Sequence, residues 1–302
     1  MKKQVILQVG DREYILGRKT WLMGVLNVTP DSFSDGGWFF DPARAIDHGL
    51  RLIEEGSDIL DVGGESSRPG SDPVSTEEEI ARVVPVIRAL RRQTRTLISI
   101  DTTKADVSRA ALDAGADIIN DISAMLFDPG MLPLAAERRA PVILMHMQGT
   151  PKTMQARPHY DDVVGEVFTF LKERAATARE FGIPESRIIV DPGIGFGKRH
   201  QDNLDLIRGL DRLGDLGRPV LLGVSRKSFI GRILDQPAAE QRLEGTIASS
   251  VLGALHGAHI LRVHDVAAVL RAVRVAEAIM ETEEKSPTRP PSGKEERSSY
   301  AG

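Results

Sequence analysis

The sequence predicts an α/β protein: a single parallel (β/α)8 barrel of the TIM type, with an N-terminal β-hairpin and a disordered C-terminal tail. Short runs rich in Val, Ile and Leu recur along the chain, and a helical pattern follows each one. The runs are almost continuously apolar, which is typical of parallel strands covered on both faces. Each run also ends abruptly in a polar residue. Polar residues gathered at the carboxyl ends of the strands are typical of the active-site end of such a barrel.

The first element is a hairpin, expected within residues 1–17. Two β-rich runs, Gln4–Val9 and Glu13–Leu16, flank a Gly-Asp dipeptide that is typical of a tight turn. We expect this hairpin to cover the bottom of the barrel, which should extend over residues 18–282.

The eight predicted barrel strands share an apolar run and a polar end. They are Trp21–Leu26 ending at Asn27, Ile59–Gly64 at Glu65, Leu97–Ile100 at Asp101, Asp117–Ile119 at Asn120, Pro141–Met145 at His146, Arg187–Val190 at Asp191, Pro219–Val224 at Ser225 and His259–Val263 at His264. Any one polar end has a plain alternative explanation, since polar residues also mark where strands stop. Eight in succession favour a shared mouth. Strict alternation also allows a large doubly wound sheet, but eight units of this size favour the barrel.

Helical patterns separate these strands. They cover residues 42–55, 76–92, 104–114, 130–138, 161–181, 201–213, 238–255 and 266–282, with a further short helix over Phe229–Leu234. The last long one is the clearest, because Val266, Val269 and Val273 fall on one helical stripe. Residues 283–302 are charged, rich in proline and almost free of large apolar side chains, so we expect a disordered tail.

The composition excludes several classes of protein. The 302 residues, 41% of them hydrophobic, suffice for one sizeable core. The chain has no cysteine, which excludes disulfides, thiolate metal sites and cysteine nucleophiles. The net charge of −4 shows no overall excess of basic residues, so the composition does not indicate a nucleic-acid-binding protein. The N-terminal segment does not resemble a signal peptide, and no stretch reaches about 18 uninterrupted apolar residues, so we expect no membrane partner and a cytoplasmic location.

The loop after Asn27 is the most informative segment, and it reads VTPDSFSDGG. Turn chemistry explains Pro30, Asp31 and the glycines. It does not explain an exposed Phe33 among hydroxyls and acids, a composition that suits a lid over a reacting ligand. A second flexible loop reads GGESSRPG and carries Arg68, which would either meet an anion or lie in solvent.

Three further strand ends carry candidate ligand groups. Asp101 precedes Thr102 and Thr103, either of which would act as the N-cap of the next helix. Asn120 ends a strand, where an isolated Asn is commonly a turn residue. Asp191 opens the segment DPGIGFGK, which matches neither the Walker motif nor the dinucleotide fingerprint. Its glycines would instead let the backbone pass close to a flat ligand.

Cationic residues follow the last two strands. Arg226 and Lys227 lie just past the seventh strand, where barrels of this architecture often bind phosphate. Arg262 and His264 are two residues apart, so we expect both to project towards the mouth. An inward Arg is costly unless it is paired or serves a ligand, which favours a functional role for this pair. There is no G-x-S-x-G elbow, no H-E-x-x-H motif and no tight histidine cluster.

Taken together, seven motifs resemble those of the dihydropteroate synthases. They are MGVLNVTPDSFSDGG, GGESSRPG, DTTK, NDIS, DPGIGFGK, GVSRKSF and RVHDV, and they occur in that family's order from about Thr20 to about Val275. Ser67 stands where many relatives have Thr, and it keeps the hydroxyl. The resemblance implies an enzyme that condenses 6-hydroxymethyl-7,8-dihydropterin pyrophosphate with p-aminobenzoate to 7,8-dihydropteroate in folate biosynthesis. In that reaction pyrophosphate leaves first, and the arylamine, neutral at pH 7, attacks without a strong base.

The resemblance also implies a role for each candidate residue. The catalytic set would be Asn27, Asp101, Lys227, Arg262 and His264. The pterin would meet Asp101, Asn120, Asp191 and Lys227, which together accept and donate hydrogen bonds at its aminopyrimidinone edge. The pyrophosphate would meet Asn27, Arg68, Arg262 and His264. The p-aminobenzoate would meet Phe33, Ser67, Arg68, Pro69 and Ser228. Asp31 and Asp35 would stabilise developing positive charge.

The expected cofactor is Mg²⁺, held mainly by the side-chain oxygen of Asn27, since sparse protein ligation is normal for this ion. The expected partners are the two small-molecule substrates and, because dimers are common in the family, a second copy of the chain. Three rival readings stay open: a methyltetrahydrofolate-binding methyltransferase with the same barrel, a non-catalytic pterin-binding paralogue, and an unrelated barrel phosphatase or aldolase. The first of these should lack the loops around residues 27–37 and 225–228.

Overall fold

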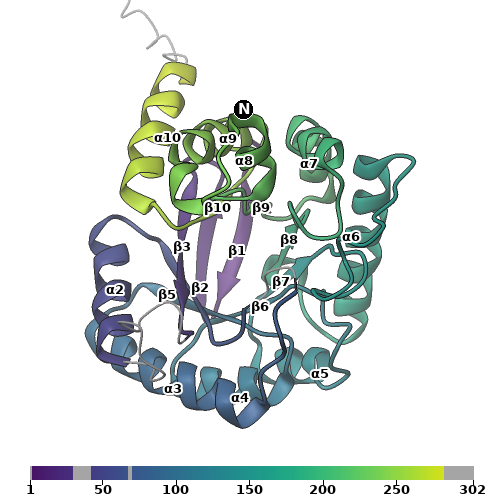
Figure 1. The fold of residues 1–302 in the computed structure, drawn as a ribbon. Coiled ribbons are helices and arrows are strands. Elements are labelled where there is room, and N and C mark those ends of the chain that lie inside the picture. The colour runs from purple at the N-terminus through teal and green to yellow at the C-terminus, as the bar shows by residue number, and fades with distance from the viewer. Residues whose placement is uncertain (1, 30–41, 67–69, 282–302) are drawn as a thin grey trace, which may run out of the picture.

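The barrel is closed by eight parallel strands. The computed structural model describes residues 2–29, 42–66 and 70–281. Its parallel sheet has the strand order β8-β7-β6-β5-β4-β3-β10-β9, and a bridge between Val190 and Val220 joins the two edges. Helices surround this sheet (Figure 1). The predicted (β/α)8 barrel is therefore confirmed.

The barrel strands are β3 (Trp21–Asn27), β4 (Ile59–Gly63), β5 (Leu97–Asp101), β6 (Ile118–Asp121), β7 (Val142–Met145), β8 (Ile188–Asp191), β9 (Leu221–Leu222) and β10 (Ile260–Val263). The helices around them are α2 (Pro42–Glu54), α3 (Thr76–Gln93), α4 (Ala105–Ala114), α5 (Met131–Arg138), α6 (Val163–Glu180), α7 (His200–Arg208), α8 (Ser228–Leu234), α9 (Leu243–Leu255) and α10 (Val266–Met280). Short 3-10 helices cover η1 (Glu185–Arg187), η2 (Leu210–Leu216) and η3 (Ala239–Gln241). Among the residues that the structure describes, no helix is long and apolar enough to cross a membrane.

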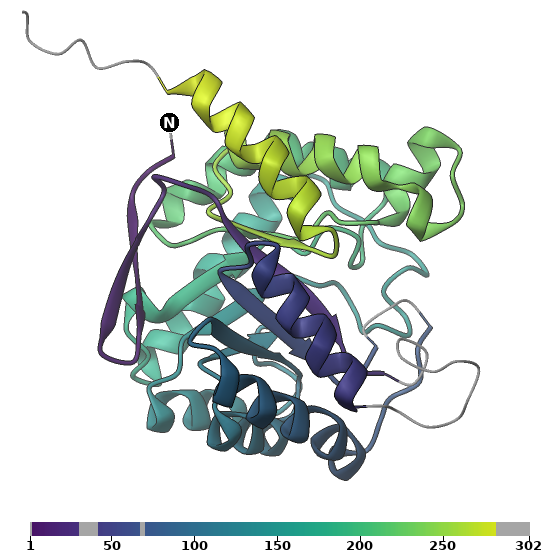
Figure 2. The same cartoon turned by 90° about the vertical axis from the view of Figure 1, so that its left-hand side faces the viewer.

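The hairpin of β1 (Val5–Val9) and β2 (Arg12–Leu16) covers one end of the barrel, as predicted (Figure 2). Its buried side chains, Leu7 and Leu16 among them, pack against a layer that takes one residue from each barrel strand. That layer is Met23, Ile59, Leu97, Ile118, Ile143, Ile189, Leu221 and Ile260. These residues lie towards the N-terminal ends of their strands, so the apolar plug leaves only the opposite end open to a ligand.

The structure differs from the predicted elements in three helical regions and in β9, which covers only Leu221–Leu222 of the predicted run Pro219–Val224. The N-cap of α4 is Lys104, without a side-chain hydrogen bond, so the expected threonine cap is wrong. Asp128 takes its place, because its carboxylate accepts the backbone N–H of Ala105 at 2.7 Å. The helix predicted over 201–213 ends as an α-helix at Arg208 and continues as η2 after Gly209. The helix predicted over 238–255 is likewise divided into η3 and α9. The predicted tail lies outside the described residues.

Candidate active site at the mouth of the barrel

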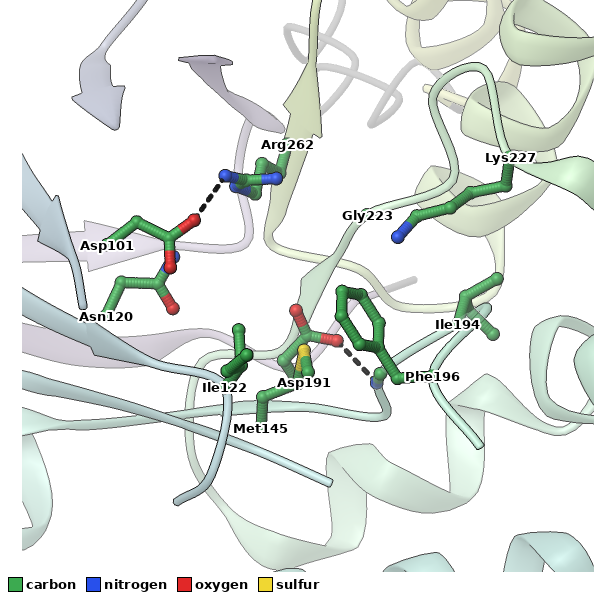
Figure 3. A pocket seen from close by; sticks show the side chains of 11 residues that line it. Asp101, Asn120, Ile122, Met145, Asp191, Ile194, Phe196, Gly223, Lys227 and Arg262 are labelled. Atoms are coloured by element: carbon green, nitrogen blue, oxygen red, sulfur yellow. Dashed lines mark hydrogen bonds and ion pairs between the residues drawn. The ribbon is translucent and has the colours of Figure 1, made fainter. Parts of the chain in front are cut away.

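A pocket opens at the carboxyl ends of the strands (Figure 3). Five of the predicted site residues share it, coming from four strand ends and the loop after β9: Asp101, Asn120, Asp191, Lys227 and Arg262. The other lining residues are Ile122, Met145, Gly193, Ile194, Phe196 and Gly223. These side chains come together because the strands are parallel, so the carboxyl ends of neighbouring strands lie side by side.

Arg262 of β10 is the centre of a charged cluster in the pocket. Its Nε donates to Asp61 at 2.5 Å, and its Nη2 donates to Asp101 at 2.7 Å. These contacts meet the expectation that an inward Arg must be paired. Although burial opposes it, the two carboxylates raise the pKa of Arg262, so the guanidinium stays charged.

Asp101 lies at the end of β5, between Arg262 and further acids. Burial, followed by the charge of Asp61, raises the pKa of Asp101 to about 7, and the charge of Arg262 opposes this rise. Near neutral pH this carboxyl therefore exchanges a proton easily. A group in this state can donate or accept a hydrogen bond at a ligand.

Asp191 lies at the end of β8 and is held by the loop that follows it. Its Oδ1 accepts the backbone N–H of Gly193 at 2.7 Å. Gly193 has a φ of +67°, and a Cβ there would lie 2.0 Å from the carbonyl oxygen of His146, so only glycine fits. Burial raises the pKa of Asp191 to about 6. The carboxylate is nevertheless the main form at neutral pH and can accept two N–H groups from a flat ligand.

Lys227 enters the pocket from the loop after β9. Its Nζ lies 4.2 Å from the centroid of the Phe196 ring, a cation–π distance. Burial, followed by the charge of Arg262, lowers the pKa of Lys227 to about 8. Figure 3 shows Ile122 and Met145 on one side of Asp191 and Phe196 on the other. The pocket thus combines apolar walls with acid, amide and ammonium groups, which suits a flat heterocycle with polar edges.

His264 does not line this pocket, although it was predicted to project there with Arg262. It lies one residue past β10, where its Nδ1 is 3.0 Å from the hydroxyl oxygen of Ser225. Its backbone N–H donates to the same oxygen at 3.2 Å. Burial and the charge of Arg262 lower the pKa of His264 to about 3, so the imidazole is neutral at pH 7. It can donate one N–H to an anion but brings no positive charge.

Arg226, next to Lys227, points elsewhere. Its Nη2 and Nε donate to Asp265 at 2.7 and 3.0 Å. Its φ of 59° is in the left-handed region, which turns the two neighbouring side chains in different directions. Only Lys227 of this pair lines the pocket.

The remaining predicted site residues lie away from the pocket or outside the described residues. Asn27 ends β3 and is half-buried, paired in register with Gly63. Ser228 is exposed at the first position of α8. The loop residues Asp31, Phe33, Asp35, Ser67, Arg68 and Pro69 lie outside the described residues. Within the described ranges there is no group of three or more His, Asp or Glu side chains that could hold a metal ion.

Sequence reasoning missed several residues of the site. Asp61 is fully buried in β4 and bonds Arg262. An acid in the middle of the apolar run Ile59–Gly63 was the available signal. Ser225 was seen as a strand end but not as the partner of His264. The apolar walls carry no polar signature and could not be separated from ordinary core residues. His146, which the sequence showed only as a strand end, lies with its Nδ1 3.0 Å from the Nζ of Lys198.

Comparisons with known proteins agree on one family. A model described as pterin binding enzyme matches residues 23–264. The chain is 48% identical over 273 residues to a dihydropteroate synthase of Synechocystis sp., covering 90% of this chain and 94% of that protein. It is 48% identical over 263 residues to the dihydropteroate synthase of Escherichia coli, covering 87% and 93%.

Solved structures show the same similarity. The structure of Xanthomonas albilineans dihydropteroate synthase with 4-aminobenzoic acid matches with a TM-score of 0.86 and 48% identity, over 93% of this chain and 100% of that one. The same enzyme in complex with 7,8-dihydropteroate matches with a TM-score of 0.80 and 47% identity, over 89% and 97%.

Proposed function

The chain belongs to the pterin-binding enzymes and, within them, to the dihydropteroate synthases, and we propose that the pocket at the barrel mouth is where it performs their reaction. It is a transferase that condenses 6-hydroxymethyl-7,8-dihydropterin pyrophosphate with p-aminobenzoate, giving 7,8-dihydropteroate and pyrophosphate. This site is supported above all by one pocket that is lined by Asp101, Asn120, Asp191, Lys227 and Arg262.

The pterin lies between the apolar walls, with its polar edge towards Asp191 and Asn120. Asp191 accepts two N–H groups of the aminopyrimidinone, and Asn120 offers an amide beside it. Lys227 donates to a ring oxygen or nitrogen, and Asp101 meets the same ring system. Supporting this arrangement, the acid, the amide and the ammonium converge on a space with Ile122 and Phe196 on its sides.

The pyrophosphate lies towards Arg262, with the neutral imidazole of His264 donating one hydrogen bond and Asn27 and Arg68 completing the subsite. Arg262 stays charged, and guanidinium groups bind phosphate oxygens in a bidentate manner. As the bond to the leaving group breaks, negative charge grows on the pyrophosphate. Groups held in place for that charge stabilise the transition state, so these residues promote dissociative loss of pyrophosphate.

The incoming p-aminobenzoate lies against Phe33, Ser67, Arg68 and Pro69, with Ser228 near its carboxylate. Its amine is neutral at pH 7 and needs orientation rather than a strong base. In the described part of the chain no nucleophile–base pair faces the pocket, in keeping with this chemistry. Asp31 and Asp35 are assigned to the stabilisation of positive charge on the pterin.

Mg²⁺ is the divalent ion that we propose for the pyrophosphate. Asn27 would hold it through its side-chain oxygen, which fits because Mg²⁺ prefers oxygen ligands and often takes few of them from protein. Asn27 at the end of β3 is half-buried, so it stays partly accessible from outside. When bound, the ion supplies charge neutralisation for the leaving group.

A second copy of the chain is the proposed protein partner. Large apolar side chains are exposed along α9 and α10, including Leu252 at 50%, Val275 at 61% and Ile279 at 76%. Apolar surface gathered on neighbouring helices marks an interface. Sedimentation of the wild type and of Val275→Glu would test this, and a wild-type monomer would refute it. A cytoplasmic location is also proposed, to be checked by cell fractionation.

The function is tested by mixing the purified protein with the pterin pyrophosphate, p-aminobenzoate and Mg²⁺. We expect dihydropteroate to form, detected by its mass, and no product without either substrate. A protein that binds both substrates without turnover would instead be a non-catalytic pterin-binding relative.

The division of the site between two substrates gives a paired prediction. Asp191→Ala removes the acceptor for the pterin edge, so pterin binding should be lost. Phe33→Ala should largely spare pterin binding and weaken the use of p-aminobenzoate. Calorimetry with the pterin on both purified variants measures this, and the reverse order would refute the assignment.

A further inference from the structure

We propose that Asp61 is a positioning residue of this enzyme, which holds Arg262 and Asn120 from inside the barrel in the places where they meet substrate. Asp61 lies beneath the pocket and does not line it. The inference rests on the proposed function of the pocket, because it explains what holds two of the pocket residues, Arg262 and Asn120, in place.

The contacts of Asp61 set it apart from a carboxylate that serves the backbone. It is fully buried in the middle of β4. Its Oδ2 accepts from Arg262 at 2.5 Å and from Asn120 at 3.1 Å, and its Oδ1 accepts from the hydroxyl of Ser99. Within the described residues every one of its hydrogen-bond donors is a side chain, and they come from three other strands.

For Arg262 the effect is immobilisation. The side chain has many rotamers and loses conformational freedom when it is fixed. Asp61 holds Nε and Asp101 holds Nη2, so the guanidinium plane is set by two anchors. With Asp101 as the only anchor, the plane could rotate.

For Asn120 the effect is orientation. An amide can turn either its oxygen or its nitrogen towards the pocket. A carboxylate only accepts hydrogen bonds, and the Nδ2 of Asn120 donates to Asp61 at 3.1 and 3.3 Å. The oxygen of the amide is therefore the end left to accept an N–H group from the pterin. Asp61 thus decides which edge of the heterocycle Asn120 recognises.

The test compares Asp61→Asn with a matched control, Asp117→Asn. Both positions carry a carboxylate that pairs with an arginine at 2.5 Å, but Asp117 pairs with Arg91 next to the first residue of β6, at the end opposite the pocket. Asp61→Asn keeps the shape of the side chain while it removes the charge and the strict acceptor. We measure the kinetic constants for both substrates and express them per folded molecule. A residue with a purely structural role would then leave these constants unchanged, whereas a positioning residue would alter them.

We expect Asp61→Asn to lower kcat/KM for the pterin pyrophosphate about 100-fold through misplacement of Arg262 and Asn120. The KM for p-aminobenzoate should change by no more than about twofold, since only groups that touch the pterin and its pyrophosphate are displaced. Calorimetry should show weaker binding of 6-hydroxymethylpterin, which carries no pyrophosphate. Asp117→Asn should keep wild-type constants. A folded Asp61→Asn protein with wild-type constants would overturn the proposal.

Ser99→Ala covers the case in which Asp61→Asn does not fold. It removes one hydrogen bond from Asp61 and leaves the charge, so kcat/KM for the pterin substrate should fall about fivefold, as for a lost hydrogen bond of about 1 kcal/mol. Unchanged constants in this variant would also overturn the role of Asp61. A wild-type protein that forms no dihydropteroate would refute the proposed function itself, so the two failures are distinct.

Discussion

At the base of the barrel, two carboxylates accept backbone N–H groups of neighbouring strands, whereas at the mouth Asp61 and Asp101 face charged and amide side chains. Asp58 and Asp117 each accept a strand N–H at 2.8 Å, from Leu22 and Ile98. At the mouth, Asp61 and Asp101 share Arg262 instead. The base therefore uses its acids to join strands, and the mouth holds its acids for a ligand.

The two ends also differ in the kind of side chain that they bury. The hairpin seals the base with a continuous layer of aliphatic side chains. At the mouth, burial raises the pKa of Asp101 to about 7 and lowers that of Lys227 to about 8, so both ions are held at an energetic disadvantage. Buried groups with strongly shifted pKa values that line a pocket are candidates for catalysis. The base of the barrel therefore contributes stability, and the mouth carries the groups for activity.

The largest expected effect comes from Lys227→Met at the mouth. The fold should not suffer, because a lowered pKa means that the ammonium destabilises the folded state below pH about 8, and Met has a similar shape. Activity should fall about 100-fold or more with the loss of a donor to the reacting ligand. Steady-state kinetics and thermal unfolding at pH 7 measure both. A clear fall in Tm together with activity would break the contrast between the two ends.

Leu7→Ala probes the opposite end. Leu7 is fully buried in the layer under the barrel, so truncation should lower the free energy of unfolding by about 3 kcal/mol. The kcat/KM of the folded protein should match the wild type, because the pocket is at the other end. Urea unfolding and kinetics on the same preparation measure this. Altered constants for either substrate would mean that the base shapes the mouth.

Asp101→Asn tests the cost of burying an acid at the mouth through the pH dependence of stability. The raised pKa of Asp101 means that the folded wild type keeps a proton that the unfolded chain releases between pH about 4 and about 7. Wild-type stability from this group therefore falls as pH rises across that window, by at most about 1.4 kcal/mol per pH unit. Asp101→Asn should gain stability relative to the wild type over the same window. Urea unfolding at several pH values tests this, and a constant difference would contradict it.

Much of the site was predictable from the sequence because each strand end is a local feature. Three of its residues stand where apolar runs stop, namely Asp101, Asn120 and Asp191, and parallel pairing brings such positions together. Arg262 was found by its spacing of two residues from the strand end at His264. Asp61 was not predicted as a site residue because it lies inside an apolar run, and its role depends on side chains from β5, β6 and β10. The contact of Ser225 with His264 was not predicted for a similar reason, since the two residues are distant along the chain.

The barrel, the hairpin and the polar strand ends follow from local patterns in the chain, because hydrophobic period and turn chemistry act over a few residues. Which charged groups meet depends on the folded molecule. Arg226 and Lys227 are neighbours with the same sign, yet the backbone at Arg226 directs one to Asp265 and the other to the pocket. The helix cap at Asp128 and the partners of Asp61 were decided in the same way. Such choices depend on groups that are far apart in the chain, so no local pattern contains them.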